Sequence, residues 1–336
     1  FGTLCESWVR DYGVDGIRFD VGNEISHRML KELRRRVRAI RPDVYLLGEI
    51  WHDASPWLEG DEYDAVMNYP LQQAVKDFFA DSARTAGELA EQLYRCLHLY
   101  RCQTTEVLFN LMDSHDTDRL FTRSGSEDAF FQQLALLFTL PGSPCIYYGT
   151  EVALPGGHDP DCRRCMPWDK MNTTENQQRI DQLRRLIALR RTLPELRDGM
   201  PVFRQAPGAR QVWYCRGRVE VLLNAGNTPW ELCPEKEILF ERGLTGNRLA
   251  PGGICKEKPM KDMEVVFFDL YGTLIRIHTD EEDLTRVWRP LCYLYGYYGA
   301  SYTPGTLRAA YRREISRQEA AAQAATGKRL VEIRLE

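Results

Sequence analysis

Two acidic residues of this chain stand where a sheet would bring them together. Asp20 ends a short strand pattern that starts at Ile17, Glu49 follows the apolar residues 44–47 after one glycine, and a helical pattern separates the two stretches. A parallel strand needs such a crossover, usually a helix, and neighbouring strands lie about 5 Å apart. Two carboxylates about 5–5.5 Å apart suit the cleavage of a glycosidic bond by double displacement. Asp20 and Glu49 are therefore our first candidates for chemistry.

Three further polar side chains could join this pair. Arg18 lies two positions before Asp20, so both point to the same strand face, and the cation would keep the Asp20 carboxylate ionised. A later apolar run, 106–112, ends in a polar stretch that contains His115 and Asp116. Each residue alone has a structural reading, as a helix cap, an ion pair or a turn. Their occurrence together favours a catalytic cluster.

The elements that must position these residues alternate between strand and helix. Helical periodicity and turn residues mark the boundaries. The expected strands are residues 17–21, 44–47, 63–69, 106–112 and 145–148. The expected helices are residues 4–12, 25–40, 71–80, 86–101, 130–140 and 183–193. Such alternation indicates an α/β fold with a parallel sheet and helices outside it, and polar residues at strand ends are typical of barrel enzymes.

The pattern changes near residue 200. Short strands are expected at residues 211–215, 218–223, 230–232 and 238–240, which predicts an antiparallel sheet or a β-sandwich. Residues 251–259 are rich in Gly and Pro and read as a linker. A third pattern starts near Met263 with a buried strand, 265–268, that ends on Asp269, and helices follow from about residues 284 and 307. We therefore expect domains at residues 1–199, 200–259 and 260–336.

Composition narrows the class of protein. The 336 residues carry a net charge of −4, which gives no basic field for nucleic acid. No apolar run reaches the roughly 18–20 residues that a membrane span needs, and no secretory signal opens the chain. The ten cysteines predict reduced thiols in a cytoplasmic protein, since Cys162 and Cys165 lack a second pair at zinc-site spacing. The chain starts at Phe1 and stops in a charged stretch, so we expect both ends to be cut.

Four stretches resemble strand motifs of the α-amylase family, glycoside hydrolase family 13. Residues 16–24, 48–53, 110–117 and 142–149 are similar to its fourth, fifth, seventh and eighth strand motifs, in that order. Residues 21–24, 67–70 and 159–165 are similar to its neopullulanase and cyclomaltodextrinase branch. The resemblance covers residues 1–258. It implies strands 4–8 of a (β/α)8 TIM barrel, followed by a small β-sandwich domain.

The resemblance also implies roles. Asp20 would be the nucleophile, Glu49 the general acid and then the base, and Asp116 would hold the distorted sugar. Arg18 would contact Asp20, and His115 would bond to sugar hydroxyl groups. Further substrate contacts are implied at a set of residues near the first two motifs: Asn23, Glu24, Trp51 and His52. The substrate would be an α-glucan oligosaccharide such as a maltodextrin, a cyclodextrin or pullulan, and no cofactor would be needed.

The sequence departs from that family in two ways. Its second and third strand motifs are absent, and Thr150 stands where the family has an acidic residue. We therefore expect these residues alone to lack activity.

Residues 263–336 resemble a second family, the haloacid dehalogenase superfamily. Asp269 and the residues up to Leu274 are similar to its first motif, in which an Asp at a strand end forms an aspartyl intermediate. The resemblance implies the start of a Rossmann-like domain with a helical cap. A completed domain would use Mg²⁺.

Our interpretation is a segment of a retaining α-glucan hydrolase joined to the start of a dehalogenase-like hydrolase. Three alternatives remain open. They are a phosphatase or dehalogenase with a vestigial glycosidase part, a non-catalytic sugar-binding module, and an artefact that joins two reading frames. No nucleic acid or membrane partner is expected, and the sequence leaves the oligomeric state open.

Overall fold

The computed structural model describes residues 1–233, 236–259, 288–289, 292 and 302–326. Contacts between residues divide the chain into two units, Phe1–Met263 and Glu264–Glu336. Each unit is described by itself.

The first unit begins with a row of short parallel strands. β1 (Gly16–Phe19), β2 (Tyr45–Gly48) and β3 (Ala65–Val66) lie side by side in that order. β4 (Phe109–Asn110) pairs in parallel with β5 (Ser143–Pro144), and a parallel bridge from Met67 to Phe109 joins the two groups. We call these five strands the strand arc. Their order confirms the predicted alternation, and the residues that follow the strands share one edge of the arc.

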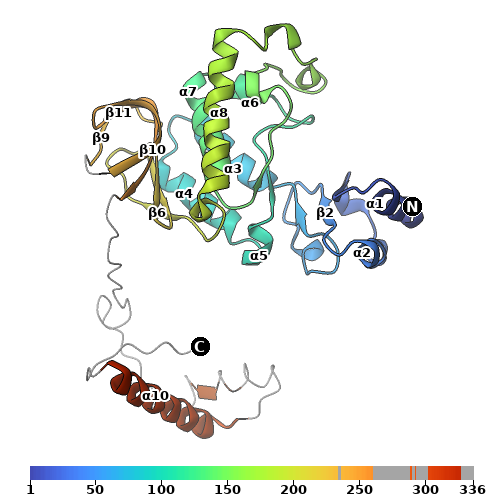
Figure 1. The fold of residues 1–336 in the computed structure, drawn as a ribbon, viewed down its shortest axis with the longest axis vertical. Helices are drawn as coiled ribbons and strands as arrows, with labels where there is room; N and C mark the ends of the chain where they lie inside the picture. The colour runs from blue at the N-terminus through green and yellow to red at the C-terminus, as the bar shows by residue number, and fades with distance from the viewer. Residues whose placement is uncertain (234–235, 260–287, 290–291, 293–301, 327–336) are drawn as a thin grey trace. The chain divides into compact units, whose positions relative to one another are not determined.

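Helices separate the strands of the arc (Figure 1). The α-helices of this unit are α1 (Gly2–Asp11), α2 (His27–Ile40), α3 (Tyr69–Ala80), α4 (Ala86–Leu97), α5 (Cys102–Thr105), α6 (Leu120–Ser124), α7 (Glu127–Thr139) and α8 (Thr174–Thr192). Single 3-10 turns are η1 (Gly22–Glu24), η2 (Ser55–Trp57), η3 (Thr150–Val152), η4 (Asp161–Arg163), η5 (Trp168–Lys170) and η6 (Pro194–Leu196).

Side-chain periodicity explains how these helices pack. In α2 the buried residues Leu30, Leu33 and Val37 recur at three- and four-residue spacing, so one stripe faces the arc. The helix α7 is buried along ten consecutive positions, Phe130–Thr139, because it lies inside the unit rather than at its surface. Each buried Phe or Leu of that helix contributes about 1.5–3 kcal/mol relative to an exposed position.

The predicted strand at residues 145–148 is wrong. The strand β5 ends at Pro144, and Cys145 makes one last ladder bond, from its N–H to the Asn110 carbonyl at 2.7 Å. The chain then turns, because Thr150 N donates to the Tyr147 carbonyl and Gly149 has a φ of 84°. The Tyr148 carbonyl accepts from the buried Arg119 guanidinium instead of from a neighbouring strand.

An antiparallel sheet follows the arc. It consists of β6 (Val202–Arg204), β7 (Gln211–Arg216), β8 (Val219–Asn224), β9 (Trp230–Glu231), β10 (Lys236–Thr245) and β11 (Arg248–Pro259), in the order β10-β11-β8-β7-β6. One face packs on the helices, since Tyr214, Val221 and Ile254 belong to the same apolar core as α3, α4, α7 and α8. The sheet lies beside α8, away from α1 and α2 (Figure 1).

The predicted antiparallel sheet is confirmed, whereas the sandwich alternative and the predicted linker are wrong. The strands form one six-stranded sheet, because the long β11 pairs with β9 in its first part and with β8 in its second. Residues 251–259 form the end of β11 rather than a linker. Gly252 supplies a φ of 78° where β11 and β10 shift register, so the Gly-rich stretch bends a strand instead of ending it.

A pair of asparagines joins the two groups of strands in the arc. Asn68 N donates to the Phe109 carbonyl at 2.8 Å, and Asn68 Nδ2 donates to Asn110 Oδ1 at 2.8 Å. Asn110 Nδ2 in turn donates to the Pro141 carbonyl at 2.6 Å. Both asparagines are buried. We call this pair the asparagine seam, because side-chain bonds continue the join where the backbone bridge stops.

The second unit is described only in part. The helix α10 (Pro304–Thr326) confirms the helix predicted from residue 307, and the Trp288 and Tyr311 rings lie 5.4 Å apart. The predicted strand 265–268 and Asp269 lie outside the described residues. None of the described helices combines the length and apolar character that crossing a membrane requires.

Candidate active site

One arginine joins the two carboxylates that the sequence predicts to react. Phe19 and Gly48 are register partners in β1 and β2, so Asp20 and Glu49 follow neighbouring strand ends. Arg18 Nη1 contacts Asp20 Oδ1 at 2.6 Å, and Arg18 Nη2 contacts Glu49 Oε1 at 2.9 Å. The guanidinium therefore holds one oxygen of each carboxylate. We call Arg18, Asp20 and Glu49 the Arg18 triad.

The two carboxylates differ in exposure. The Asp20 side chain is 75% exposed, whereas that of Glu49 is 7% exposed. Glu49 Oε2 also accepts from Val21 N at 3.0 Å, so both of its oxygens are held by donors. Asp20 is thus open to a ligand, while Glu49 is fixed behind it.

A tight backbone crossing fixes the orientation of Glu49. Gly22 N donates to the Glu49 carbonyl at 2.9 Å, and Tyr63 Oη donates to the Gly22 carbonyl at 3.0 Å. A Cβ on Gly22 would lie 3.0 Å from Tyr63 Oη and 3.2 Å from Glu49 N, so a glycine fits best. Val21 has a φ of 45°, an unusual value for a β-branched residue. Local backbone strain of this kind occurs where surrounding contacts fix a functional residue.

Asp116 approaches from the loop after β4. His115 Nε2 contacts Asp116 Oδ2 at 2.9 Å, and Arg163 Nη2 contacts Asp116 Oδ1 at 3.1 Å. The buried Cys162 thiol donates to the His115 carbonyl at 3.0 Å, which ties the turn η4 to this loop. Each Asp116 oxygen is therefore positioned by a separate partner.

An aromatic pair comes from the segments that follow β2 and β3. The Trp51 and Tyr69 rings stack with centroids 3.6 Å apart and planes inclined by 9°. Burial raises the pKa of the Tyr69 hydroxyl, which also feels the charges of Glu49, Asp116 and Arg18. The indole of Trp51 remains 48% exposed and offers an apolar face.

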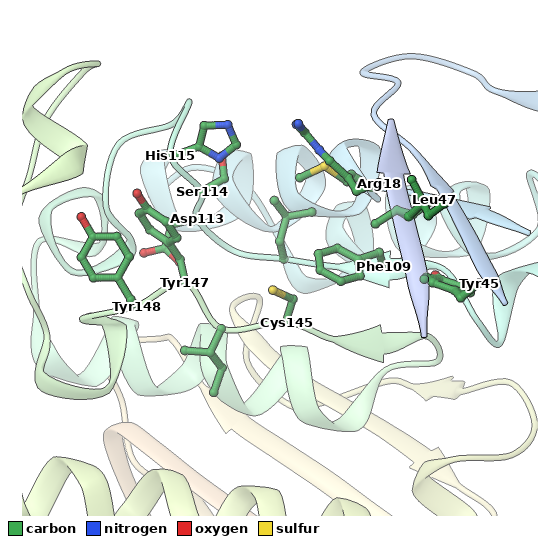
Figure 2. A pocket seen from close by; sticks show the side chains of 15 residues that line it. Arg18, Tyr45, Leu47, Phe109, Asp113, Ser114, His115, Cys145, Tyr147 and Tyr148 are labelled. Carbon is green, nitrogen blue, oxygen red and sulfur yellow. The ribbon is translucent and has the colours of Figure 1, made fainter. Parts of the chain in front are cut away.

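A groove of about 390 Å³ runs below this cluster along the inner face of the strand arc. Its lining is mainly apolar and includes Leu47, Met67 and Phe109. Figure 2 shows the Arg18 guanidinium and the His115 ring facing each other across its rim. The polar groups therefore gather at one end of an apolar groove, as is usual for a site that binds a small molecule.

Other predicted contacts lie outside this constellation. Asn23 Nδ2 lies 3.4 Å from Glu24 Oε1, so their described side-chain contact is with each other. His52 Nδ1 contacts the Asp53 carbonyl at 2.9 Å. Thr150 hydroxyl donates to the buried Asp113 carboxylate, whose pKa is raised by burial, so Thr150 has a structural partner.

Two residues of the site were not predicted from the sequence. Tyr69 and Arg163 both lie in stretches that resemble the neopullulanase branch, and that resemblance was the available signal. Their roles depend on ring stacking and on a loop-to-loop ion pair, which periodicity does not reveal. Among the residues that the structure describes, no group of three or more His, Cys, Asp or Glu side chains is arranged to hold a metal ion.

Comparison with known proteins agrees with this geometry. The family described as "Alpha amylase, catalytic domain" matches residues 2–184. A cyclomaltodextrinase of Geobacillus thermopakistaniensis (strain MAS1) is 48% identical over 200 residues, which cover 58% of this chain and 33% of that protein. A maltogenic alpha-amylase of Bacillus acidopullulyticus is 46% identical over 190 residues, covering 56% of this chain and 32% of that protein.

The solved structures agree as well. The debranching enzyme of Nostoc punctiforme superposes with a TM-score of 0.67 at 31% identity, over 76% of this chain and 60% of that chain. The chain spans about a third of the length of the curated relatives named above. The matched family covers more than half of this chain, from α1 into α8, and includes every residue of the site. The chain therefore belongs to the α-amylase family of glycoside hydrolases.

Proposed function

We propose that this chain carries the reacting groups of a retaining α-glucan hydrolase that acts on maltodextrins, cyclodextrins or pullulan. The observation that supports it best is the Arg18 triad, in which one cation joins two carboxylates at neighbouring parallel strand ends. Relatives named cyclomaltodextrinase and maltogenic alpha-amylase support the substrate class.

The proposed reaction has two displacements. The Asp20 carboxylate attacks the anomeric carbon while Glu49 gives its proton to the departing glycosidic oxygen. The resulting ester on Asp20 is then hydrolysed by a water that loses a proton to the Glu49 carboxylate, and the product regains the α configuration. The exposure of Asp20 and the fixed position of Glu49 suit these two roles.

Glu49 must hold a proton for the first step. Both of its oxygens accept hydrogen bonds from Arg18 and from Val21 N. A proton on one oxygen weakens the contact which that oxygen accepts, and substrate bound against Arg18 would loosen the contact with Glu49 Oε1. Arg18 would then turn fully to Asp20 and keep the nucleophile ionised.

The remaining groups would bind the sugar. Asp116, held by His115 and Arg163, would accept hydrogen bonds from hydroxyl groups of the distorted ring. The exposed face of Trp51 would stack on a neighbouring glucose unit. Because all ten cysteines are free thiols, we place the protein in the reducing cytoplasm.

On its own, this chain is expected to be inactive. Within the described residues, β1 and β5 are the edge strands of the arc. The unpaired backbone groups of an edge strand pair with strands of other chains, which leads to aggregation. Purified residues 1–258 that released reducing sugar from maltodextrin at an enzyme's rate would contradict this expectation.

The reaction is tested in a chimera. Residues 2–259 of this chain replace the corresponding stretch of the G. thermopakistaniensis cyclomaltodextrinase, which supplies the rest of the enzyme. Glu49→Gln in the chimera is mixed with α-maltosyl fluoride, whose leaving group needs no proton. The ester on Asp20 should accumulate, because its hydrolysis lacks a base.

Peptide mapping by mass spectrometry locates the ester, with Asp20→Asn as the unlabelled control. Added azide should release a glycosyl azide of the α configuration. A label on another residue, or a β-configured first product from the unmutated chimera, would contradict the proposed roles.

A further inference from the structure

The antiparallel sheet has a second polar cluster, on the face turned away from the shared core. Side chains alternate between the two faces of a strand. Tyr214 and Val221 therefore join the core below, while Trp213 and Leu222 belong to a separate small apolar cluster with Trp230 and Leu249. A hollow of about 450 Å³ opens on this second face. Its lining includes Trp213, Leu222, Trp230, Leu232, Lys236 and Glu257.

Three charged side chains are fixed beside these tryptophans. Lys236 Nζ contacts Glu220 Oε1 and Glu257 Oε1, each at 2.7 Å. Glu220 and Glu257 are register partners in β8 and β11, and their side chains are only 11% and 2% exposed. We call Lys236, Glu220 and Glu257 the Lys236 triad. Buried charges cost free energy unless they are paired, and this triad has no part in the site on the strand arc.

The charged residues also orient an aromatic surface. Trp213 Nε1 donates to Glu220 Oε2 at 2.8 Å, and the Trp213 and Trp230 rings meet edge to face at 6.3 Å and 68°. Trp213 is partly exposed, whereas Trp230 is buried. The Trp213 ring, which lines the hollow, is thus held in one orientation, and a preorganised surface binds a ligand at lower entropic cost.

We propose that this hollow is a second α-glucan binding site, separate from the reacting groups. A glucose ring has an apolar face of C–H groups, which fits an aromatic ring, and a rim of hydroxyl groups, which can bond to polar side chains. The hollow offers the partly exposed Trp213 ring, and Gln205, Glu231 and Lys236 also belong to its lining. A cationic peptide is the less favoured ligand, because Lys236 already neutralises half of the charge of the Glu220 and Glu257 carboxylates, which are nearly buried. The choice of an α-glucan rests on the proposed function.

Maltoheptaose binding to the full chain, residues 1–336, tests the proposal. The indole N–H signals of the tryptophans are followed by NMR, and Trp213→Phe identifies the Trp213 signal. Maltoheptaose should shift the Trp213 and Trp230 signals along one saturable curve. Trp213→Ala should weaken the affinity read from Trp230 at least about tenfold, a loss of about 1.4 kcal/mol, and Trp213→Phe should weaken it less. Val202→Ala changes an exposed apolar residue of the same sheet and should leave the curve unchanged.

Several outcomes would overturn the proposal. One is a Trp213 signal that maltoheptaose does not move. A second is a Trp230 response that survives Trp213→Ala while circular dichroism shows an intact fold. A third is a response to tetralysine and none to maltoheptaose, which would make the hollow a peptide site. Asp20→Asn should not change the Trp213 response, so a failure of the hydrolase assignment is separate from a failure here.

Discussion

The Arg18 triad and the Lys236 triad contain the same charges in different settings. In each, one cation lies between two carboxylates on neighbouring strands. The Arg18 triad lies at the ends of parallel strands and leaves Asp20 75% exposed. The Lys236 triad lies within antiparallel strands, and both of its carboxylates are nearly buried. At the strand ends one carboxylate stays exposed and can react, whereas within the paired strands both carboxylates are buried and fixed.

The two cations also differ in the geometry of their contacts. The guanidinium is a planar fork that contacts two carboxylates through different nitrogens, while an ammonium is a compact charge that brings both toward one point. Arg18 can therefore keep its contact with one carboxylate while its contact with the other changes. Lys236 contacts both carboxylates through one nitrogen, so a displacement of Lys236 would weaken both contacts, and the second triad is suited to a structural role.

Removal of the exposed carboxylate should have the largest effect. In the chimera, Asp20→Asn should lower kcat by roughly 10³-fold or more, because no covalent ester can form. The matched change Glu220→Gln in the other triad should leave kcat unchanged. Initial rates on maltotriose measure both. Equal losses in the two variants would remove the distinction between a reacting triad and a structural one.

Removal of the buried cation should mainly affect stability. Lys236→Met leaves Glu220 and Glu257 facing each other without their cation, which should lower the free energy of unfolding by about 3–5 kcal/mol. Arg18→Met leaves the exposed Asp20 to water and the buried Glu49 with its Val21 N donor, so it should cost less stability but more activity. Urea unfolding of the full chain gives both values. A triple variant that also carries Glu220→Gln and Glu257→Gln should recover most of the loss, and its failure to do so would contradict the repulsion argument.

A second lysine of the same sheet sharpens the contrast through pH. Lys256 is fully buried on the core face, its Nζ has no hydrogen-bond partner among the residues that the structure describes, and burial lowers its pKa to about 7. The unfolded chain then binds more protons between pH 7 and about 10.5, so stability should rise with pH in that range by up to about 1.4 kcal/mol per unit. Hydrogen bonds to Glu220 and Glu257 raise the pKa of Lys236 despite opposing desolvation, so its stabilisation is lost only at still higher pH.

Urea unfolding at pH 7, 8 and 9 tests this dependence. Lys256→Met should be more stable than the unmutated chain at pH 7, and its stability should vary less across these values. An unchanged slope in that variant would show that another group is responsible.

The ion pair that orients Asp116 should have the smallest effect. Arg163 and Asp116 are 47% and 29% exposed, and exposed pairs contribute about 0.2–1 kcal/mol. Arg163→Gln in the chimera should therefore lower kcat/KM by at most about fivefold, with stability unchanged. Arg164→Gln, in which the ion pair to Asp161 is removed, is the control. A loss as large as that of Asp20→Asn would place Arg163 among the reacting groups.

Sequence patterns predicted which charged residues of the strand arc lie together better than they predicted where its strands end. The spacing from Asp20 to Glu49 predicted neighbouring strand ends because a helical crossover permits few other arrangements, and Arg18 followed from the two-residue period of a strand. The end of β5 could not be predicted from local sequence, because Arg119, which lies 29 residues away in the chain, donates a hydrogen bond to the Tyr148 carbonyl. Propensity describes local preference, and a buried cation from another loop overrides it.

The antiparallel sheet shows the same limit. Pro251, Gly252 and Gly253 have the composition of a linker, yet β8 and β10 pair with the residues around them and continue the strand. The Lys236 triad was not predicted at all, since its members come from three strands whose register the sequence does not fix. Long-range pairing supplies information that local composition lacks.

The asparagine seam lies between the two halves of the site. The Arg18 triad belongs to one group of strands and Asp116 follows the other. The backbone bridge, the asparagine pair and the packing of Leu108 and Leu111 in the core of the first group join the two. A ligand that contacts both groups would add to this join. Part of its binding free energy would then go into holding the two halves of the site in one relative position.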